Sequence, residues 1–401
     1  MSEAIRKQSV LTDIMDHLLD GELPEDYSLP KEETGSVRWA DGAADGVAIY
    51  HTAPPRVTME ISSLIDLAIH DASEGRYEEC CDFLRKLSRD ARAVNLVETV
   101  VNFILQHQQE LDPEGLYNTA RRIAYLSPDP ETVKYGLIIL ELLDTKDEDK
   151  PAIRTLGLSD ELTLFVILNM LHWENGNEEV FQLAQKVHGW GRIHACEYLE
   201  PGTSAINNWF LREGIRNNVM PQYSALTAWN KSGAFKRLFG RLSREDYTAI
   251  RDILAALLEE GPVAGVSEME NAEFALMQFV RKSYAFPLSE EDLAVIEMIR
   301  EYAQKTEWKL LISVLEEFGR EPEGGSAPDD LLAAKIKSHL PQQREIAVRA
   351  IGRWLAARSV PLEELSPKLY AAVMLAEELE PIEGLRAEMT KLLGEEAPMV
   401  E

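Results

Sequence analysis

The stretch ISSLIDLA, residues 61–68, shows the pattern that decides the fold of this chain. Its apolar residues are Ile61, Leu64, Ile65 and Ala68. Their i, i+3, i+4, i+7 spacing places them on one face of an α-helix, and the same spacing returns in residues 97–104 and 250–258. Because a helix with one apolar stripe cannot bury that stripe alone, we predict an all-α protein in which neighbouring helices stack.

Helix boundaries recur along the chain at short intervals. Asp112 and Asp129 each precede a proline, and Ser243 and Ser289 each precede an aspartate by three residues, which are signals that start helices. We predict helix starts near residues 59, 76, 93, 113, 130, 160 and 177, and stops at Gly176, Gly240, Gly261 and Gly319. A helix pair then spans about 35–45 residues, the period of TPR and HEAT units. The expected fold is an α-solenoid of stacked helical hairpins, and an irregular globular helical domain is the alternative.

Changes in composition divide the chain into four parts. Residues 1–56 combine a short helix with a Pro- and Gly-rich segment, and residues 57–320 form the expected helical-repeat domain. Residues 321–330, EPEGGSAPDD, have the composition of a linker, and residues 331–401 are expected to form a C-terminal helical subdomain.

The N-terminal part contains one segment that does not follow the helical pattern. It is expected to be irregular or a small β-hairpin, with residues 37–39 and 47–50 as strands and the Gly-rich residues 41–46 as the loop. A Ca²⁺ loop around Asp41 and Asp45 is the alternative, although these residues offer fewer ligands than such a loop uses.

The charge of the chain restricts its partners. It carries 69 acidic and 41 basic residues, which give a net charge of −28. Such a surface repels nucleic-acid phosphates and anionic membranes, so the composition disfavours nucleic acid and predicts no membrane partner. The chain also has only three cysteines, no apolar leader in residues 1–19, and no apolar run of the ~20 residues that a membrane span needs. These features predict a cytoplasmic protein.

The sequence contains none of the common catalytic or cofactor motifs. It lacks a P-loop, a dinucleotide-binding Gly-rich loop, a nucleophile elbow and a His-Glu-x-x-His zinc motif. His188 and His194 are six residues apart, so on a helix they do not converge on a metal, and Cys196 also points away from His194. We therefore expect no metal and no cofactor, and a non-catalytic role is favoured over an enzyme.

One region differs from the acidic remainder of the chain. Residues 186–241 hold eight basic residues against three acidic ones, a local charge of +5, together with three tryptophans. Because Trp and Arg are the residues that binding hot spots favour, this region is a candidate binding surface. Its predicted binding residues are Trp190, Arg192, His194, Trp209, Arg212, Arg216 and Arg237. The alternative is that the tryptophans belong to the core and the arginines pair with acidic neighbours.

The stretches GWGRIHA, residues 189–195, and LREG, residues 211–214, carry a resemblance. There the chain resembles a group of poorly characterised bacterial HEAT-like helical proteins, some of whose members carry a limonene hydroxylase label. The resemblance is close over about 40 residues, from Gly189 onward, and loose over residues 40–240. It implies a HEAT-like fold but supplies no catalytic residues. The chain has no haem-thiolate loop, flavin fingerprint or iron triad that a hydroxylase would need.

These observations favour an intracellular helical-repeat scaffold that binds a protein partner through the Trp/Arg-rich surface of residues 190–237. A first alternative is an enzyme or sensor that binds a small anionic ligand in the same region through Arg192, His194, Arg212 and Arg216. A second is a HEAT-like nucleic-acid binder, which the local positive charge allows and the net charge of −28 opposes.

Overall fold

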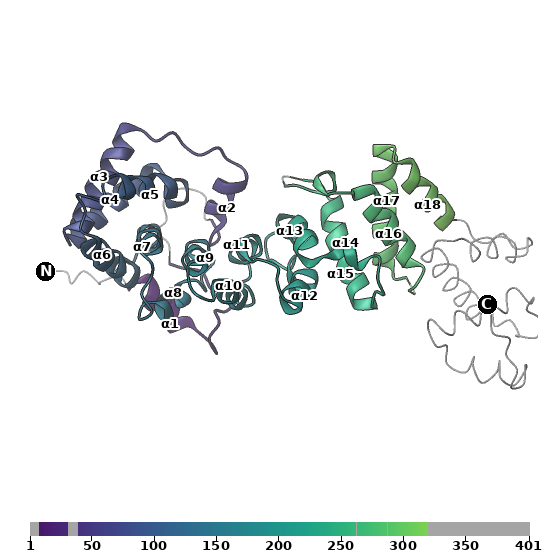
Figure 1. The fold of residues 1–401 in the computed structure, drawn as a ribbon, viewed down its shortest axis with the longest axis horizontal. Helices are drawn as coiled ribbons and strands as arrows, with labels where there is room; N and C mark the ends of the chain where they lie inside the picture. The colour runs from purple at the N-terminus through teal and green to yellow at the C-terminus, as the bar shows by residue number, and fades with distance from the viewer. Residues whose placement is uncertain (1–7, 31–38, 262, 287, 320–401) are drawn as a thin grey trace, which may run out of the picture. The chain divides into compact units, whose positions relative to one another are not determined.

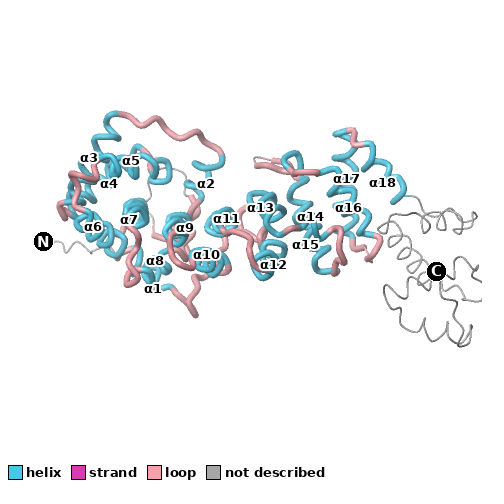
Figure 2. The backbone as a smooth tube through the Cα atoms, in the orientation of Figure 1, coloured by secondary structure: helices cyan, strands magenta, loops and turns pink. Residues whose placement is uncertain are grey.

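The computed structural model describes residues 8–30, 39–261, 263–286 and 288–319 of the chain. These residues form eighteen α-helices and two 3-10 helices. Figure 2 shows no strand among them, only helices joined by loops and turns. The all-α prediction is therefore confirmed for the described part of the chain.

The chain divides into two compact units. Unit 1 comprises the described residues of Met1–Ser232 and Gly261–Ala264. Its first helices are α1 (Val10–His17), α2 (Ala43–Tyr50), α3 (Met59–Ser73), α4 (Tyr77–Asp90), the 3-10 helix η1 (Ala93–Asn95), α5 (Val97–Gln106) and α6 (Pro113–Leu126). They are followed by α7 (Pro130–Leu142), α8 (Lys150–Leu156), α9 (Thr163–Leu171), α10 (Gly176–Ala184), α11 (Trp190–Tyr198), α12 (Ser204–Glu213) and α13 (Gln222–Ser232).

Unit 2 comprises the described residues of Gly233–Glu260 and Gly265–Glu401. Its helices are α14 (Ala234–Arg237), α15 (Arg244–Leu258), the 3-10 helix η2 (Val266–Glu268), α16 (Ala272–Ser283), α17 (Glu290–Thr306) and α18 (Lys309–Gly319). The division between the units therefore falls inside residues 57–320, which were expected to form one domain. The predicted linker 321–330 and C-terminal subdomain 331–401 lie outside the described residues.

The start signals in the sequence act as predicted. The Asp129 carboxylate accepts a hydrogen bond from the Thr132 backbone N–H at 3.0 Å and so caps the start of α7. Ser289 and Asp292 form a complete capping box at the start of α17, in which each side chain accepts from the backbone N–H of the other residue. The predicted starts at residues 59, 113 and 130 coincide with the first residues of α3, α6 and α7.

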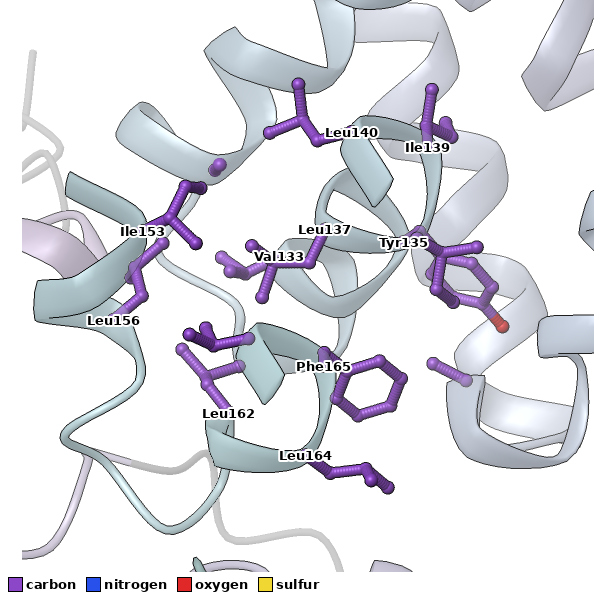
Figure 3. Packing of buried hydrophobic residues seen from close by; sticks show 14 of the residues in the cluster. Val133, Tyr135, Leu137, Ile139, Leu140, Ile153, Leu156, Leu162, Leu164 and Phe165 are labelled. Atoms are coloured by element: carbon purple, nitrogen blue, oxygen red, sulfur yellow. The ribbon is translucent and has the colours of Figure 1, made fainter. Parts of the chain in front are cut away.

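Unit 1 is built from packed helix pairs (Figure 1). The helix α3 packs on α4 and α6 packs on α7, while α3 also contacts α6 and α4 contacts α7, so that one pair lies on the other. Every residue of α7 from Thr132 to Leu140 is buried, which makes α7 the central helix of this stack. Figure 3 shows apolar side chains of α7, α8 and α9 meeting in the core around it.

The expectation of a β-hairpin in the N-terminal segment is wrong for residues 47–50, because they belong to helix α2. The Gly-rich stretch before them is not a hairpin loop. Gly42 has a positive φ of 72° and forms the N-cap of α2, and Asp41 accepts a hydrogen bond from the Leu29 backbone N–H at 2.9 Å. Asp45 is instead buried and contacts Arg92 and Lys134, so the two aspartates bind different partners. Residues 37 and 38 lie outside the described part of the chain.

None of the described helices has both the length and the hydropathy that crossing a bilayer requires.

Candidate functional site

An open groove of about 590 Å³ lies on unit 1, between segments that are far apart in the sequence. We call it the α2 groove. Its lining residues are Ala48, Ile49, Thr52, Pro54, Val94, Asn95, Val97, Glu98, Val101, Glu141, Leu142 and Leu168. They come from the end of α2 and the loop after it, from η1 and α5, from the end of α7, and from α9. The volume lies within the range of ligand-binding pockets, ~300–1,000 Å³.

The lining of the α2 groove is mostly apolar and partly exposed. Ile49 on the α2 wall keeps 44% of its surface exposed. On the α5 wall, the apolar residues of the stretch 97–104 have two different environments. Val100 and Ile104 are buried in the core, whereas Val97 and Val101 are half-buried and line the groove. The groove therefore offers apolar contact surface that the described part of the chain does not cover completely.

Helix α2 forms one wall of the groove, and its opposite face is fitted to Trp190. Gly42, Gly46 and Tyr50 recur every four residues and lie on this face. A Cβ atom on Gly46 would lie 2.2 Å from the Trp190 ring, and one on Gly42 would lie 2.7 Å from the Trp190 Cβ. Both glycines are thus needed for the close approach of the indole. The Tyr50 ring completes the contact, with its centroid 6.1 Å from that of Trp190.

The two glycines of the GWGRI stretch make room for a carboxylate. A Cβ on Gly189 or Gly191 would lie 2.3 Å or 2.5 Å from an Asp160 carboxylate oxygen. Asp160 accepts a hydrogen bond from the Gly189 backbone N–H at 2.9 Å, at the start of α11, where a carboxylate also stabilises the helix dipole. Burial raises the pKa of Asp160 to about 6, against the opposing effect of the Gly189 and Gly191 N–H groups. This stretch of the resemblance therefore has a structural role in unit 1.

A cluster of five charged side chains joins α2 to α7 and to the segments just before η1 and α9. We call it the ion cluster, and its members are Asp45 of α2, Arg92 just before η1, Glu131 and Lys134 of α7, and Glu161 before α9. The Lys134 ammonium is fully buried, and its Nζ lies 2.6 Å from Asp45 Oδ2, 2.5 Å from Glu131 Oε1 and 2.6 Å from Glu161 Oε1. The Arg92 guanidinium donates to Asp45 Oδ1 at 2.6 Å and to Glu131 Oε1 at 2.8 Å.

The ion cluster also fixes the backbone of both walls. Glu161 accepts a hydrogen bond from the Gly42 N–H, at the start of α2, at 2.9 Å. Glu131 accepts one from the Ala93 N–H, at the start of η1, at 3.0 Å. Charge-assisted hydrogen bonds of this kind are stronger than neutral ones, so the cluster sets the position of α2 relative to η1.

The charges of the cluster respond to burial and to one another. Burial raises the pKa of Asp45, and the neighbouring Glu131 and Glu161 carboxylates add to the rise. Burial also tends to raise the pKa of Glu131, but the charges of Lys134 and Arg92 outweigh burial and lower this pKa. Burial would lower the pKa of Lys134, but the three carboxylates outweigh it and raise the pKa, so the ammonium stays charged. Lys134 and Arg92 thus oppose the cost of burying the three carboxylates.

The three carboxylates alone have the spacing of a metal site, because oxygens of Asp45, Glu131 and Glu161 lie within 4.8 Å of one another. The Lys134 ammonium is within hydrogen-bonding distance of all three and takes the central position that a cation would need. The arrangement is therefore an internal ion network rather than a set of free metal ligands.

His194 lies beside this network in the core of unit 1. It is 3% exposed, its ring stacks on that of Tyr50 with a centroid distance of 6.5 Å, and its Nε2 has no hydrogen-bond partner among the described residues. Burial, followed by the charge of Lys134, lowers the pKa of His194 to about 4. A neutral imidazole is therefore part of the aromatic packing behind α2.

The predicted Trp/Arg surface is divided by the structure. Trp190, Trp209 and also Trp229 are buried. Arg192 is buried too, with its Nη1 donating to the Arg216 carbonyl oxygen at 2.8 Å and its guanidinium 5.5 Å from the Trp209 ring centroid.

Three arginines remain more accessible. Arg212 and Arg216 are exposed, and Arg216 lies 3.4 Å from Glu213. Arg237 belongs to unit 2 and lies 3.6 Å from Asp246. The structure thus brings Trp190, His194, Arg192 and Trp209 into the interior of unit 1, while Arg212 and Arg216 lie on its surface.

The α2 groove and the ion cluster were not found from the sequence. One signal was present, since Lys134 is the only charged residue in the apolar run TVKYGLIIL, residues 132–140, and such a residue in a buried helix requires buried partners. The sequence could not show which of the 69 acidic residues pair with Lys134. Comparison with known proteins adds no identification, because no protein-family model, curated protein or solved structure matches this chain.

Proposed function

We propose that this protein is a helical scaffold that binds a protein partner, and that the α2 groove of unit 1 is its docking site. The observation that supports this most strongly is the groove itself, whose apolar walls keep residues such as Ile49 half-exposed. Apolar surface that stays exposed in a groove is one of the features that mark protein-interaction sites. The stacking of the α3–α4 pair on the α6–α7 pair supports a solenoid-like scaffold of the HEAT type.

The position of the proposed site differs from the surface predicted from the sequence. The tryptophans that suggested a hot spot are buried in unit 1 and cannot supply the anchoring contacts of an interface unless the unit rearranges. The α2 groove offers apolar contact without such a rearrangement. It also connects the two stretches that stood out in the sequence, since Gly42, Gly46 and Trp190 hold the α2 wall in place.

The charge of the groove favours a protein over a small anion. Among the described residues, its lining includes Glu98 and Glu141 and no basic residue. An anionic ligand or a nucleic-acid phosphate would therefore meet repulsion in this groove.

The proposal is tested with matched surface variants of the full chain. Ile49→Asp places a charge in the groove, and Leu67→Asp is the control, because Leu67 is also exposed, at 46% against 44%, but does not line the groove. Each protein is used as bait in lysate of its source cells, and the recovered proteins are quantified by mass spectrometry. We expect partners that are recovered with the wild type and the control but lost with Ile49→Asp. Recovery of the same proteins by all three baits would refute the proposed site.

A further inference from the structure

We infer that the segment bound in the α2 groove is short and places a lysine or arginine next to apolar side chains; this inference deepens the function proposed above and rests on it. The groove is small, about 590 Å³, and can hold only a few side chains at once. The occupant is therefore a segment of a partner chain, with affinity concentrated in a few residues.

The requirement for a basic residue follows from Glu98. Its side chain is exposed in the first turn of α5 and has no ion-pair or hydrogen-bond partner among the described residues. Beside it, Val94, Val97 and Val101 are apolar. An occupant that covers these valines also removes water from the Glu98 carboxylate, and this loss must be offset by a new partner for the charge. A lysine or arginine can supply that partner while its methylene groups lie along the valines.

The second carboxylate of the groove is already engaged. Glu141 is 22% exposed and lies 2.8 Å from His172 Nε2. It retains a second oxygen and adds negative potential to the same lining. An acidic segment would face both carboxylates, whereas a purely apolar segment would cover Glu98 without pairing it. Only a segment that combines apolar and basic residues satisfies the whole lining.

The charge of the entire protein acts in the same direction. With a net charge of −28, the chain attracts basic segments over long range and repels acidic ones. This attraction raises the association rate more than it strengthens the bound state, so the binding should weaken as salt is added.

The test is a selection of random linear peptides displayed on phage, with the immobilised full chain as target. The selection is run in parallel on the wild type, on Ile49→Asp and on Glu98→Lys. We expect peptides enriched by the wild type, but not by Ile49→Asp, to combine apolar residues with lysine or arginine. On Glu98→Lys the preference for basic residues should be lost.

Synthetic versions of the enriched peptides then give affinities by fluorescence anisotropy. Glu98→Gln should weaken binding about two- to fivefold, the effect of one exposed ion pair, and added salt should weaken it further. Glu79→Gln is the matched control, because Glu79 is also an exposed glutamate in the first turn of a helix, but on α4 and outside the groove.

The outcomes separate the two proposals. Peptides that require Ile49 but carry no basic residue, or that ignore Glu98→Gln, would overturn the inference about the partner and leave the docking site in place. Peptides that bind the wild type and Ile49→Asp equally would overturn the docking site, and the inference with it.

Discussion

Replacing Lys134 by methionine should destabilise unit 1 strongly. Methionine keeps the unbranched shape of the side chain but removes an ammonium that is fully buried and within 2.6 Å of three carboxylates. Arg92 then remains as the only cation of the ion cluster, beside Asp45 and Glu161 side chains that are 3% and 5% exposed. Removing one partner from a buried ion pair typically costs about 3–5 kcal/mol, because the opposite charge stays buried without compensation.

The measurement is urea unfolding at neutral pH, followed by circular dichroism at a helical wavelength. Lys86→Met is the control, since Lys86 also lies on a helix but is exposed to solvent, and its urea midpoint should remain that of the wild type. Adding Glu161→Gln to Lys134→Met should recover part of the loss, because glutamine removes one unpaired charge and can still accept the hydrogen bond from Gly42. Equal midpoints for Lys134→Met and Lys86→Met would refute the claim that Lys134 compensates the buried carboxylates.

The pH dependence of the same variant provides a second check. Burial already raises the pKa of Asp45, and Lys134→Met removes the strongest opposing charge, so the pKa of this carboxyl rises further in the folded variant. The folded variant then binds protons more readily than the unfolded one, so it regains stability as the pH falls toward ~4. The difference between variant and wild type should therefore be smaller at acidic pH than at neutral pH.

Three other substitutions test single contacts. The pKa of His194 is lowered from 6.5 to about 4, so the unfolded chain binds the proton more readily and stability falls as the pH drops across this window. Because leucine does not titrate, His194→Leu should lose about 3 kcal/mol less folding stability than the wild type between neutral pH and pH 4. The measurement is the urea midpoint as a function of pH, and the same pH dependence in variant and wild type would contradict the prediction. Gly46→Ala should lower the free energy of unfolding by about 1–3 kcal/mol, because the clash of the new Cβ with Trp190 outweighs the higher helix propensity of alanine. Gly202→Ala is the control and should not lower it, because the space around Gly202 is open. Ser289→Ala should cost unit 2 about 1 kcal/mol, seen as faster hydrogen exchange in α17.

The helical fold could be predicted because its signals are local. A capping aspartate such as Asp129, a following proline and an apolar stripe all act within one or two turns. Prediction failed where a glycine is present because another atom approaches it closely. Gly176 was expected to end a helix but is the first residue of α10, and a Cβ there would lie 2.3 Å from the Met170 carbonyl oxygen. The sequence shows that a glycine is present but not which atom approaches it.

The candidate site could not be predicted for a related reason. Asp45 and Lys134 are 89 residues apart, and their contact depends on the tertiary fold that brings α2 and α7 together. For the ion cluster the sequence missed a real contact, whereas for the tryptophans it suggested a surface that is buried. Trp and Arg at helical spacing are consistent with both a surface and a core. Trp190 is buried because Gly42 and Gly46 have no side chains, which lets the indole pack against α2.

The ion cluster is better explained as a positioning device than as a source of stability. Replacing a complete buried ion network by apolar residues is often neutral or stabilising, so burial of charge is an inefficient way to hold a core together. The triple variant Asp45→Leu, Lys134→Met, Glu161→Gln leaves Arg92 paired with Glu131 and should unfold at a higher urea concentration than Lys134→Met alone. Its α2 wall, however, has lost the ionic contacts of Asp45, so the amides of residues 43–50 should exchange hydrogen faster than in the wild type and groove peptides should bind more weakly. A triple variant with protected α2 amides and unchanged peptide affinity would show that apolar packing against Trp190 is sufficient to place the wall.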